Sequence, residues 1–325
     1  MKYTIFGESH GPAIGVVLEG VPSGLVVDMD FIRAELQRRA PGQNALSTAR
    51  READEPEILS GVFEGRTTGT PLCAVIRNTD TRSRDYEKMK RLPRPGHADY
   101  AGAVRYGGYN DYRGGGHFSG RLTAPLVFAG ALAKLILREK NIDVTARISI
   151  LGGVPDPTPA QIEEIILAAK QDGDSVGGAI ACTVMGVEAG HGAPDFGCNA
   201  EGIISQYLFA VPAVKGVAFG AGFGFSCMRG SEANDPFYMD GDAVRTRSNC
   251  AGGINGGITN GMPIVFEAAI RPTPSIAREQ DTVDLSVRKD AKLTVEGRHD
   301  PCIVQRALPV IEAAAALAVC ELLGI

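Results

Sequence analysis

Two histidines stand in glycine-containing turns beside groups that could assist proton transfer. Gly7-Glu8-Ser9-His10-Gly11 places a serine next to a histidine, and Arg94-Pro95-Gly96-His97-Ala98-Asp99 places a histidine two residues before a carboxylate. Histidine changes charge near neutral pH, and a neighbouring carboxylate can orient the ring or hold its proton. The second motif therefore indicates acid–base chemistry, with an incidental loop histidine as the alternative. The first indicates a small polar site, with an ordinary turn as the alternative.

The first motif also matches G-x-S-x-G, the nucleophile elbow of serine hydrolases. That elbow needs earlier strands before it and a helix after it. Only six residues precede the motif, and residues 13–20 predict a strand. We therefore keep a serine hydrolase using Ser9 only as an alternative that an ester-cleavage screen would decide.

Two glycine runs predict places where the backbone approaches an anion. Asp111-Tyr-Arg-Gly-Gly-Gly-His-Phe-Ser-Gly-Arg121 leads into a predicted helix, and the run from Asn249 to Asn260 is similar in kind. Exposed backbone N–H groups at a helix N-terminus bind phosphate, although neither run matches a named nucleotide motif. No zinc-type ligand spacing occurs, so we expect no metal site.

The charge distribution favours a small polyanion as ligand. The 325 residues carry a net charge of −5, which argues against a nucleic-acid partner. Residues 82–121 nevertheless hold nine Lys or Arg against four Asp or Glu, and Arg38, Arg39, Arg50 and Arg51 form a second basic cluster. Such clusters attract anionic substrates, the alternative being a solvated face balanced by acidic neighbours.

Composition excludes several classes of protein. A 44% apolar and 22% charged chain is not disordered, and its 41 glycines lack the collagen period. We expect no signal peptide and no membrane span, because Lys134, Glu312 and Glu321 interrupt the longest apolar stretches. Seven cysteines without C-x-x-C spacing suit a reducing cytoplasmic location.

Apolar periodicity and cap residues predict alternating strands and helices. Asp28 is the expected N-cap of the first helix, Thr158-Pro159 with Gln161 starts another, and Asp300-Pro301 is expected to cap the last one. We predict long loops at 91–120 and 226–261. Strands are predicted at 13–20, 57–63, 71–77, 143–152, 178–188, 214–220 and 262–270, and helices at 28–39, 121–140, 158–173, 199–209 and 303–323.

We find no composition break that would mark a linker, so we predict one α+β domain over residues 1–325. A weak internal echo is present: Gly65–Leu72 and Gly257–Ile264 share G-x-T-x-G-x-P before an apolar strand, and Gly120–Leu126 is a looser third copy. The echo indicates either a duplicated turn–strand unit or coincidence in a glycine-rich chain.

Eight motifs in order together resemble the chorismate synthase family. They run from residue 4 to residue 323, and no single one is specific. They are GESHG near the start, RRxPGQ at 38–43, ILSGVFEGRTTGTPL at 58–72, RPGHADY at 94–100, DYRGGG at 111–116, AGGINGG at 251–257, RPTPS at 271–275 and GRHDPC at 297–302.

The resemblance implies a reaction, a cofactor and an assembly. The family eliminates phosphate and a ring proton, in the anti-1,4 sense, from 5-enolpyruvylshikimate 3-phosphate to give chorismate, the precursor of the aromatic amino acids. It requires reduced FMN without net redox change. The implied fold is a compact β-α-β sandwich assembled as a homotetramer. Because no reductase domain is evident, we expect an external flavin reductase, with NADPH as the indirect reductant.

The resemblance also assigns roles to residues. His10 matches the histidine that assists phosphate departure, His97 the one that protonates reduced flavin, and Asp300 the carboxylate that acts through flavin N5 in removing the ring proton. Ser9 and Ser119 match supporting serines, and Arg39, Arg121 and Arg298 match substrate-binding arginines. The implied FMN contacts are His117, Phe118, Ser119, Gly256, Arg271, Pro272, Thr273, Pro274, Ser275 and Arg298.

Some positions depart from the family pattern. His117-Phe118-Ser119 replaces the common Arg-Ser-Ser, Ala45 stands where a basic residue is expected, and the chain is short before GRHDPC. A non-catalytic homologue that binds FMN or another phosphate ligand is therefore the second hypothesis.

Overall fold

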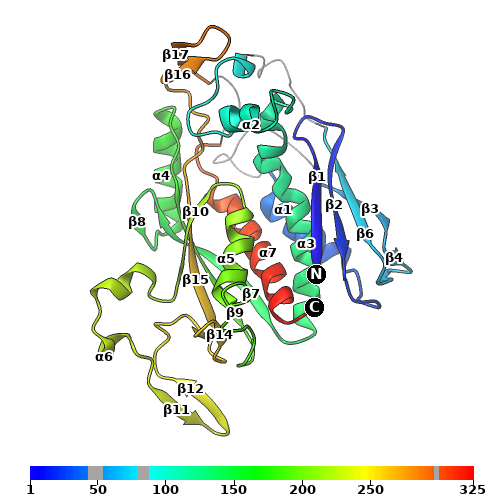
Figure 1. Ribbon diagram of the computed structural model, residues 1–325, viewed down its shortest axis with the longest axis vertical. Coiled ribbons are helices and arrows are strands. Elements are labelled where there is room, and N and C mark those ends of the chain that lie inside the picture. Colours follow the sequence, from blue (N-terminus) through cyan, green and yellow to red (C-terminus); the bar gives the residue numbers. More distant parts are fainter. Residues whose placement is uncertain (43–53, 80–87, 296–299) are drawn as a thin grey trace.

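Two antiparallel sheets enclose a layer of helices (Figure 1). The computed structural model describes residues 1–42, 54–79, 88–295 and 300–325. The first sheet has the order β1 (Lys2–Gly7), β2 (Ala13–Glu19), β6 (Leu72–Arg77) and β3 (Pro56–Ser60). The second has the order β10 (Val214–Phe219), β15 (Ile264–Ile270), β9 (Gly178–Met185), β7 (Asp143–Leu151) and β8 (Val154–Pro155).

Four helices fill the space between the sheets. They are α1 (Met29–Arg39), α3 (Thr123–Arg138), α5 (Ala200–Ala210) and α7 (Val304–Leu322). Their apolar faces and the inner faces of both sheets form one buried cluster. A β-carbon on Gly130 would lie 2.2 Å from that of Ala313, so α3 and α7 cross in close backbone contact. The α+β fold predicted from the sequence is therefore present.

The apolar character of α3 is explained by this packing. The segment Gly120–Arg138 is long and apolar enough to cross a membrane by composition alone. Most of it is buried inside the protein, against α1, α7 and the first sheet. Its hydrophobicity is that of a core helix.

Most predicted helix starts are confirmed, and one predicted cap is wrong. The Asp28 side chain accepts the N–H of Phe31 at the start of α1, and Thr158 with Gln161 forms the capping box of α4 (Pro159–Gln171). Asp300 does not cap the last helix. That helix begins at Val304 with Ile303 at the N-cap position and no side-chain cap, so Asp300 lies three residues before the cap, and its carboxylate pairs with Arg306.

The two predicted loops contain short elements. Residues 91–120 include α2 (Asp99–Arg105) and the 3₁₀ turn η2 (Arg113–Phe118), followed by η3 (Gly120–Leu122). The strand β1 and the hairpin of β16 (Gln280–Asp284) and β17 (Lys289–Leu293) were not predicted. Residues 220–250, an arm that projects from the body (Figure 1), hold η4 (Gly222–Cys227), α6 (Gly230–Ala233), β11 (Phe237–Asp240) and β12 (Ala243–Thr246).

The internal echo is a structural repeat. In one copy, β4 (Val62–Phe63) pairs with β5 (Arg66–Thr67) before β6, and in the other β13 (Ile254–Asn255) pairs with β14 (Ile258–Thr259) before β15. Thr67 and Thr259 make the same contacts. The Thr67 hydroxyl donates to the Pro22 carbonyl and accepts the Leu25 N–H, and the Thr259 hydroxyl donates to the Glu188 carbonyl and accepts the His191 N–H.

The repeat extends over both halves of the chain. The order β1, β2, α1, β3, β4–β5, β6, α3 recurs as β7, β9, α5, β10, β13–β14, β15, α7. The sheet orders β1-β2-β6-β3 and β7-β9-β15-β10 correspond strand for strand, and α1 and α5 both have 11 residues. The two copies therefore contribute α3 and α7 as equivalent neighbours at the centre of the fold.

Candidate active site

The glycine run Gly114–Gly116 lies between the two histidines of interest. All three glycines have left-handed φ values, of 59°, 81° and 53°. A β-carbon on Gly114 would be 2.6 Å from the His10 ring, and one on Gly115 would be 3.1 Å from the His97 ring. The absence of side chains here is what allows both rings to approach the same stretch of backbone.

The turn between β1 and β2 carries Ser9 and His10 into this site. The Ser9 N–H donates to the Gly116 carbonyl at 3.2 Å, and both Ser9 and His10 are buried. Among the described residues, the Ser9 hydroxyl and one carboxylate oxygen of Glu8 are buried without a hydrogen-bond partner. Unsatisfied buried polar atoms are rare and mark places where a ligand or water completes the site.

Glu8 lies in a mixed electrostatic environment. The pKa of its carboxyl group is raised above the ordinary value, mainly by burial. Asp111 also raises it, and His117 and Arg113 lower it. Arg113 is itself paired with Asp111 at 2.7 Å.

His97 is held by two charged neighbours. Its Nδ1 donates to the Asp99 carboxylate at 2.6 Å, the contact that the two-residue spacing indicated. Arg94 donates to the same carboxylate from Nε at 2.7 Å and from Nη2 at 2.8 Å. Burial would raise the pKa of Asp99, but these hydrogen bonds from Arg94 and His97 outweigh it and hold the pKa well below its usual range. Arg94 opens the RPGHADY motif, but the motif alone gave this side chain no role.

Residues 271–275, directly after β15, lie against the His97 turn. Arg94 donates from Nη1 to the Ser275 hydroxyl at 3.1 Å, and Arg271 donates to the Gly96 carbonyl. Pro274 lies beside Gly96, and Pro272 lies beside Gly177.

Thr273 contributes another buried polar atom that a ligand could contact. Its carbonyl accepts the Ser175 hydroxyl at 2.7 Å. Among the described residues, its own hydroxyl is buried without a partner.

A buried cluster of arginines lies at the C-terminal end of α1. Arg39 donates from Nη1 to Asp54 at 2.8 Å, and Arg121 pairs with the other oxygen of the same carboxylate. Burial and the neighbouring guanidinium groups of Arg306 and Arg121 lower the pKa of Arg39, and Asp54 acts in the opposite direction. Arg39 and Arg121 in turn hold the pKa of Asp54 below its usual value against the effect of burial.

Asp300 is tied to this cluster through Arg306. Arg306 donates to the Asp300 carboxylate and, from Nε, to the Arg39 carbonyl at 3.0 Å. The carboxylate is therefore anchored at the end of α1 that carries Arg39. Asp54 and Arg306 are functional neighbours that the sequence did not reveal, because each acts across a long separation in the chain.

Residues 117–119 surround the glycine run. His117 Nδ1 donates to the Gly7 carbonyl at 3.0 Å, and the Phe118 ring packs over Gly102 and near Tyr106. The Ser119 hydroxyl accepts the Arg121 N–H at 3.3 Å and so caps η3.

One predicted cofactor residue, Gly256, lies apart from the cluster. Gly256 lies in the β13–β14 turn before β15, whereas residues 271–275 follow β15, so that a seven-residue strand of about 20 Å separates them. The role of Gly256 stays a prediction that the geometry of this chain does not support. Arg298, His299, Arg50, Arg51 and Ala45 lie outside the described residues.

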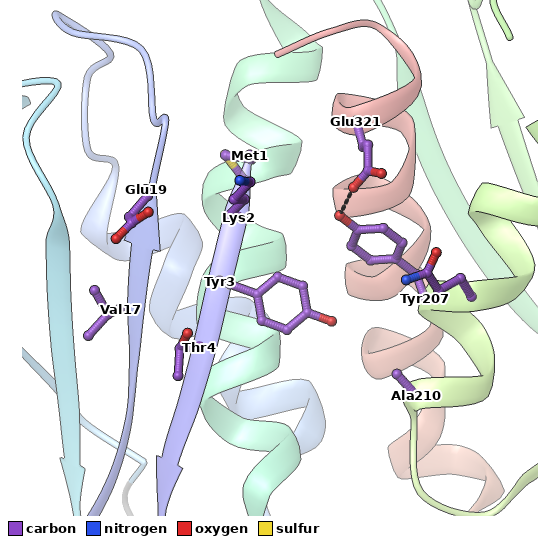
Figure 2. A pocket seen from close by; sticks show the side chains of 10 residues that line it. Met1, Lys2, Tyr3, Thr4, Val17, Glu19, Tyr207, Ala210 and Glu321 are labelled. Carbon is purple, nitrogen blue, oxygen red and sulfur yellow. Dashed lines mark hydrogen bonds between the residues drawn. The ribbon is translucent and has the colours of Figure 1, made fainter. Parts of the chain in front are cut away.

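A separate hollow of about 440 Å³ lies beside the chain termini. Figure 2 shows Tyr3 and Tyr207 facing it, with the Tyr207 hydroxyl donating to Glu321. The described residues that line it include none of the predicted site residues. The cluster around Gly114–Gly116 is therefore the candidate active site. No group of three or more His, Cys, Asp or Glu is placed to hold a metal ion within the described part of the chain.

Comparison with known proteins agrees with the motif order. The family model described as chorismate synthase matches residues 1–323. The chain belongs to the chorismate synthase family. It is 44% identical to the chorismate synthase of Dehalococcoides mccartyi, over 99% of this chain and 94% of the relative, and 46% identical to that of Thermococcus kodakarensis, over 99% and 95%. A solved chorismate synthase structure matches with a TM-score of 0.75 at 27% identity, covering 99% of this chain and 91% of that one.

Family membership makes the chain a carbon–oxygen lyase. The serine hydrolase alternative also fails on structure. Ser9 lies in a turn between the antiparallel strands β1 and β2, whereas a nucleophile elbow joins a strand to a helix.

Proposed function

We propose that this chain eliminates phosphate and a ring proton from 5-enolpyruvylshikimate 3-phosphate to form chorismate, with reduced FMN as cofactor. The observation that carries the proposal is the convergence of His10 and His97 on one glycine run, with buried Arg39 and Arg121 nearby. The substrate has two carboxylates and a phosphate, and guanidinium groups bind such oxygens in pairs.

The site residues fit a phosphate-bearing flavin. Within the described residues, the buried hydroxyls of Ser9 and Thr273 have no hydrogen-bond partner and could contact a polar group of the cofactor. A β-carbon on Gly115 would press against the His97 ring, and one on Gly116 would collide with the Asp111 carbonyl. Ser9, Thr273, Ser119 and Arg271 would hold the cofactor. When bound, reduced FMN supplies electron-rich redox chemistry without net oxidation of the substrate.

The arginines act on the departing phosphate. Negative charge builds on the leaving oxygens in the transition state, and buried cations stabilise such charge more strongly than exposed ones. Asp54 holds Arg39 and Arg121 in place before the substrate arrives. Anion binding then needs little rearrangement of these two side chains.

His10 and His97 transfer protons at different places. His10 donates a proton or a hydrogen bond to a leaving phosphate oxygen. Asp99 orients His97 through Nδ1, and Arg94 fixes the carboxylate while its Nη2 lies 3.2 Å from His97 Nε2. Asp300, anchored by Arg306, is the carboxylate that assists removal of the ring proton.

An anaerobic assay with reduced FMN and the substrate tests this proposal. We expect equal amounts of chorismate and inorganic phosphate, and turnover lowered about 10- to 10⁴-fold in His10→Ala and in His97→Ala. His191→Ala is the matched control, because His191 lies near the β13–β14 hairpin, away from the site. Flavin binding without either product would favour a non-catalytic homologue.

We further propose a homotetramer in the cytoplasm that obtains reduced FMN from an external NADPH-dependent reductase. Large apolar side chains are exposed on the projecting arm, among them Phe223, Phe237 and Met239, as expected where copies of the chain pack together. Sedimentation should give a mass of about four times the 34.2-kDa chain. A monomer at micromolar concentration would contradict the assembly.

A further inference from the structure

Asn78 lies between the Ser9-His10 turn and Arg121. It follows the end of β6, and its side-chain nitrogen donates to the Glu8 carbonyl at 3.0 Å and to the Gly11 carbonyl at 2.8 Å. Its side-chain oxygen accepts Nε–H of Arg121 at 3.0 Å. One amide thus contacts two separate parts of the candidate site.

Only an amide of this size satisfies these partners. Carbonyl oxygens accept and guanidinium nitrogens donate, so the side chain at position 78 must donate twice and accept at least once. A carboxylate would lack both donors, and an alkyl group would lack all three contacts. The partners also fix which way the amide is turned.

The two carbonyl groups that Asn78 contacts lie on either side of Ser9 and His10 in the chain. Glu8 and Gly11 are the residues just before Ser9 and just after His10, and the Gly11 N–H returns to the Glu8 carbonyl at 3.0 Å. The Asn78 amide therefore holds both ends of the Ser9-His10 dipeptide. The backbone N–H of Asn78 adds a bond to the Pro12 carbonyl at 3.2 Å.

The contact with Arg121 uses Nε and directs the rest of the guanidinium group. Arg121 is almost fully buried, and its Nη1 faces Asp54, which also pairs with Arg39. A guanidinium group held at Nε has a defined plane, which sets the direction in which its other N–H groups meet an anion.

We propose that Asn78 is a positioning residue that couples His10 to Arg121, so that the imidazole and the guanidinium group act on the same departing phosphate. This inference rests on the proposed function for the identity of that phosphate. In this role Asn78 acts through His10 and Arg121 rather than through a contact with the substrate. Displacement of a reacting group by about 1 Å can cost about 100-fold in rate, so the coupling is large enough to measure.

A double-mutant cycle in the full-length enzyme tests the coupling. We expect Asn78→Ala to lower kcat about 10- to 100-fold. Because Asn78 acts partly through His10 and partly through Arg121, the double variant Asn78→Ala/His10→Ala should lose less rate than the product of the two single losses. Multiplicative losses would overturn the proposal. Arg77→Ala is the matched control, because the neighbouring Arg77 forms an exposed pair with Glu57 and should leave kcat unchanged.

A second measurement does not depend on turnover. NMR titration of the histidines should show a shifted His10 imidazole signal in Asn78→Ala, with His97 unchanged, and inorganic phosphate should bind more weakly. The variant Asn78→Asp keeps the side-chain size but removes both donors, and it should shift the His10 signal as well. Unchanged His10 signals in both folded variants would overturn the positioning role. If the wild-type chain is inactive but the Asn78 variants still shift the His10 signal, only the proposed reaction is contradicted and the positioning role stands.

Discussion

Gly114 is the residue at which backbone conformation most directly sets the position of His10. A β-carbon there would lie 2.6 Å from the His10 ring and 3.0 Å from the Ser9 hydroxyl oxygen. The position has a φ of +59°, so a substitution adds backbone strain to this steric conflict. Strain and steric effects can be separated with a suitable control.

We expect Gly114→Ala to lower kcat about 10- to 100-fold, because the His10 ring must move. Gly108→Ala controls for strain: its φ is +80°, and nothing lies within 4 Å of an added β-carbon. That control should lose about 1–2 kcal/mol of unfolding free energy and little activity. Steady-state kinetics and urea unfolding provide the measurements. Equal kinetic losses in the two variants would show that the contact with His10 is unimportant.

Asp99 links the acid–base site to the pH dependence of stability. Its pKa lies below the unfolded value of about 3.9, so the folded state is stabilised by the ionised carboxylate above that pH. This contribution is lost as the pH falls from about 5 toward the folded pKa. The unfolding free energy of the wild type should therefore fall more steeply with acid than that of Asp99→Asn.

Urea unfolding at a series of pH values measures this difference directly. The gap between wild type and Asp99→Asn should shrink below about pH 4. The other carboxylates are present in both proteins and cancel in the comparison. A gap that stays constant in acid would contradict a lowered Asp99 pKa.

The residues that motifs identified differ from those that support them. His10, His97 and Arg39 stand in recognisable sequence patterns, so their convergence could be anticipated from the family resemblance. Asn78 and Asp54 could not, since their importance comes from contacts that only the folded chain creates, and the same holds for the role of Arg94, although it stands in the RPGHADY motif. Such supporting residues satisfy hydrogen bonds of site groups, which a sequence pattern does not record.

Among the elements, those with strong local signals were predicted. The Asp28 cap, the Thr158 capping box and the apolar period of α3 and α7 are local and were confirmed. The seven-residue α2 was missed, because a short helix containing Gly102 has little periodicity. Asp300 was wrongly assigned as a cap, since the helix begins only at Val304 and the Asp300 carboxylate pairs with Arg306, six residues further along the chain.

Gly130 tests whether packing or helix propensity dominates in α3. Alanine favours a helix over glycine by about 1 kcal/mol, so propensity alone predicts that Gly130→Ala is stabilising. An added β-carbon would meet Ala313 at 2.2 Å, and overpacking typically costs about 1–3 kcal/mol. We expect net destabilisation, measured by urea unfolding. A stabilised variant would show that α3 and α7 can separate without cost.

On the scale of the whole molecule, duplication explains how one site is built from both halves. The first copy supplies His10, His97 and Arg39, and residues 271–275 and Asp300 come from the second. Only the hairpin motif kept a visible sequence echo, because its glycines have left-handed φ values at equivalent positions, as in Gly69 and Gly261. The other elements need only apolar residues at matching places, so their sequences are free to diverge.

The chain termini meet at a junction equivalent to the turn between α3 and β7. The Met1 amino group donates to the Ile325 carbonyl. Gly324 and Asn141 both have left-handed φ values just after their helices, and Ile325 and Ile142 donate to Cys320 and Leu137 in the same pattern. We propose that residues 1–325 form one domain. In this domain the chain can begin and end either at Met1 and Ile325 or within the turn between α3 and β7.

A circular permutant tests that equivalence. Joining Ile325 to Met1 through a short glycine linker and opening the chain between Lys140 and Asn141 preserves every strand and helix. Because both junctions are surface turns with the same backbone pattern, the permutant should unfold in a single transition, with chorismate formation within about tenfold of the parent. Opening the chain between Ala129 and Gly130, inside buried α3, should abolish folding. If the permutant opened at Lys140–Asn141 fails to fold, as the one opened inside α3 should, the two junctions are not equivalent.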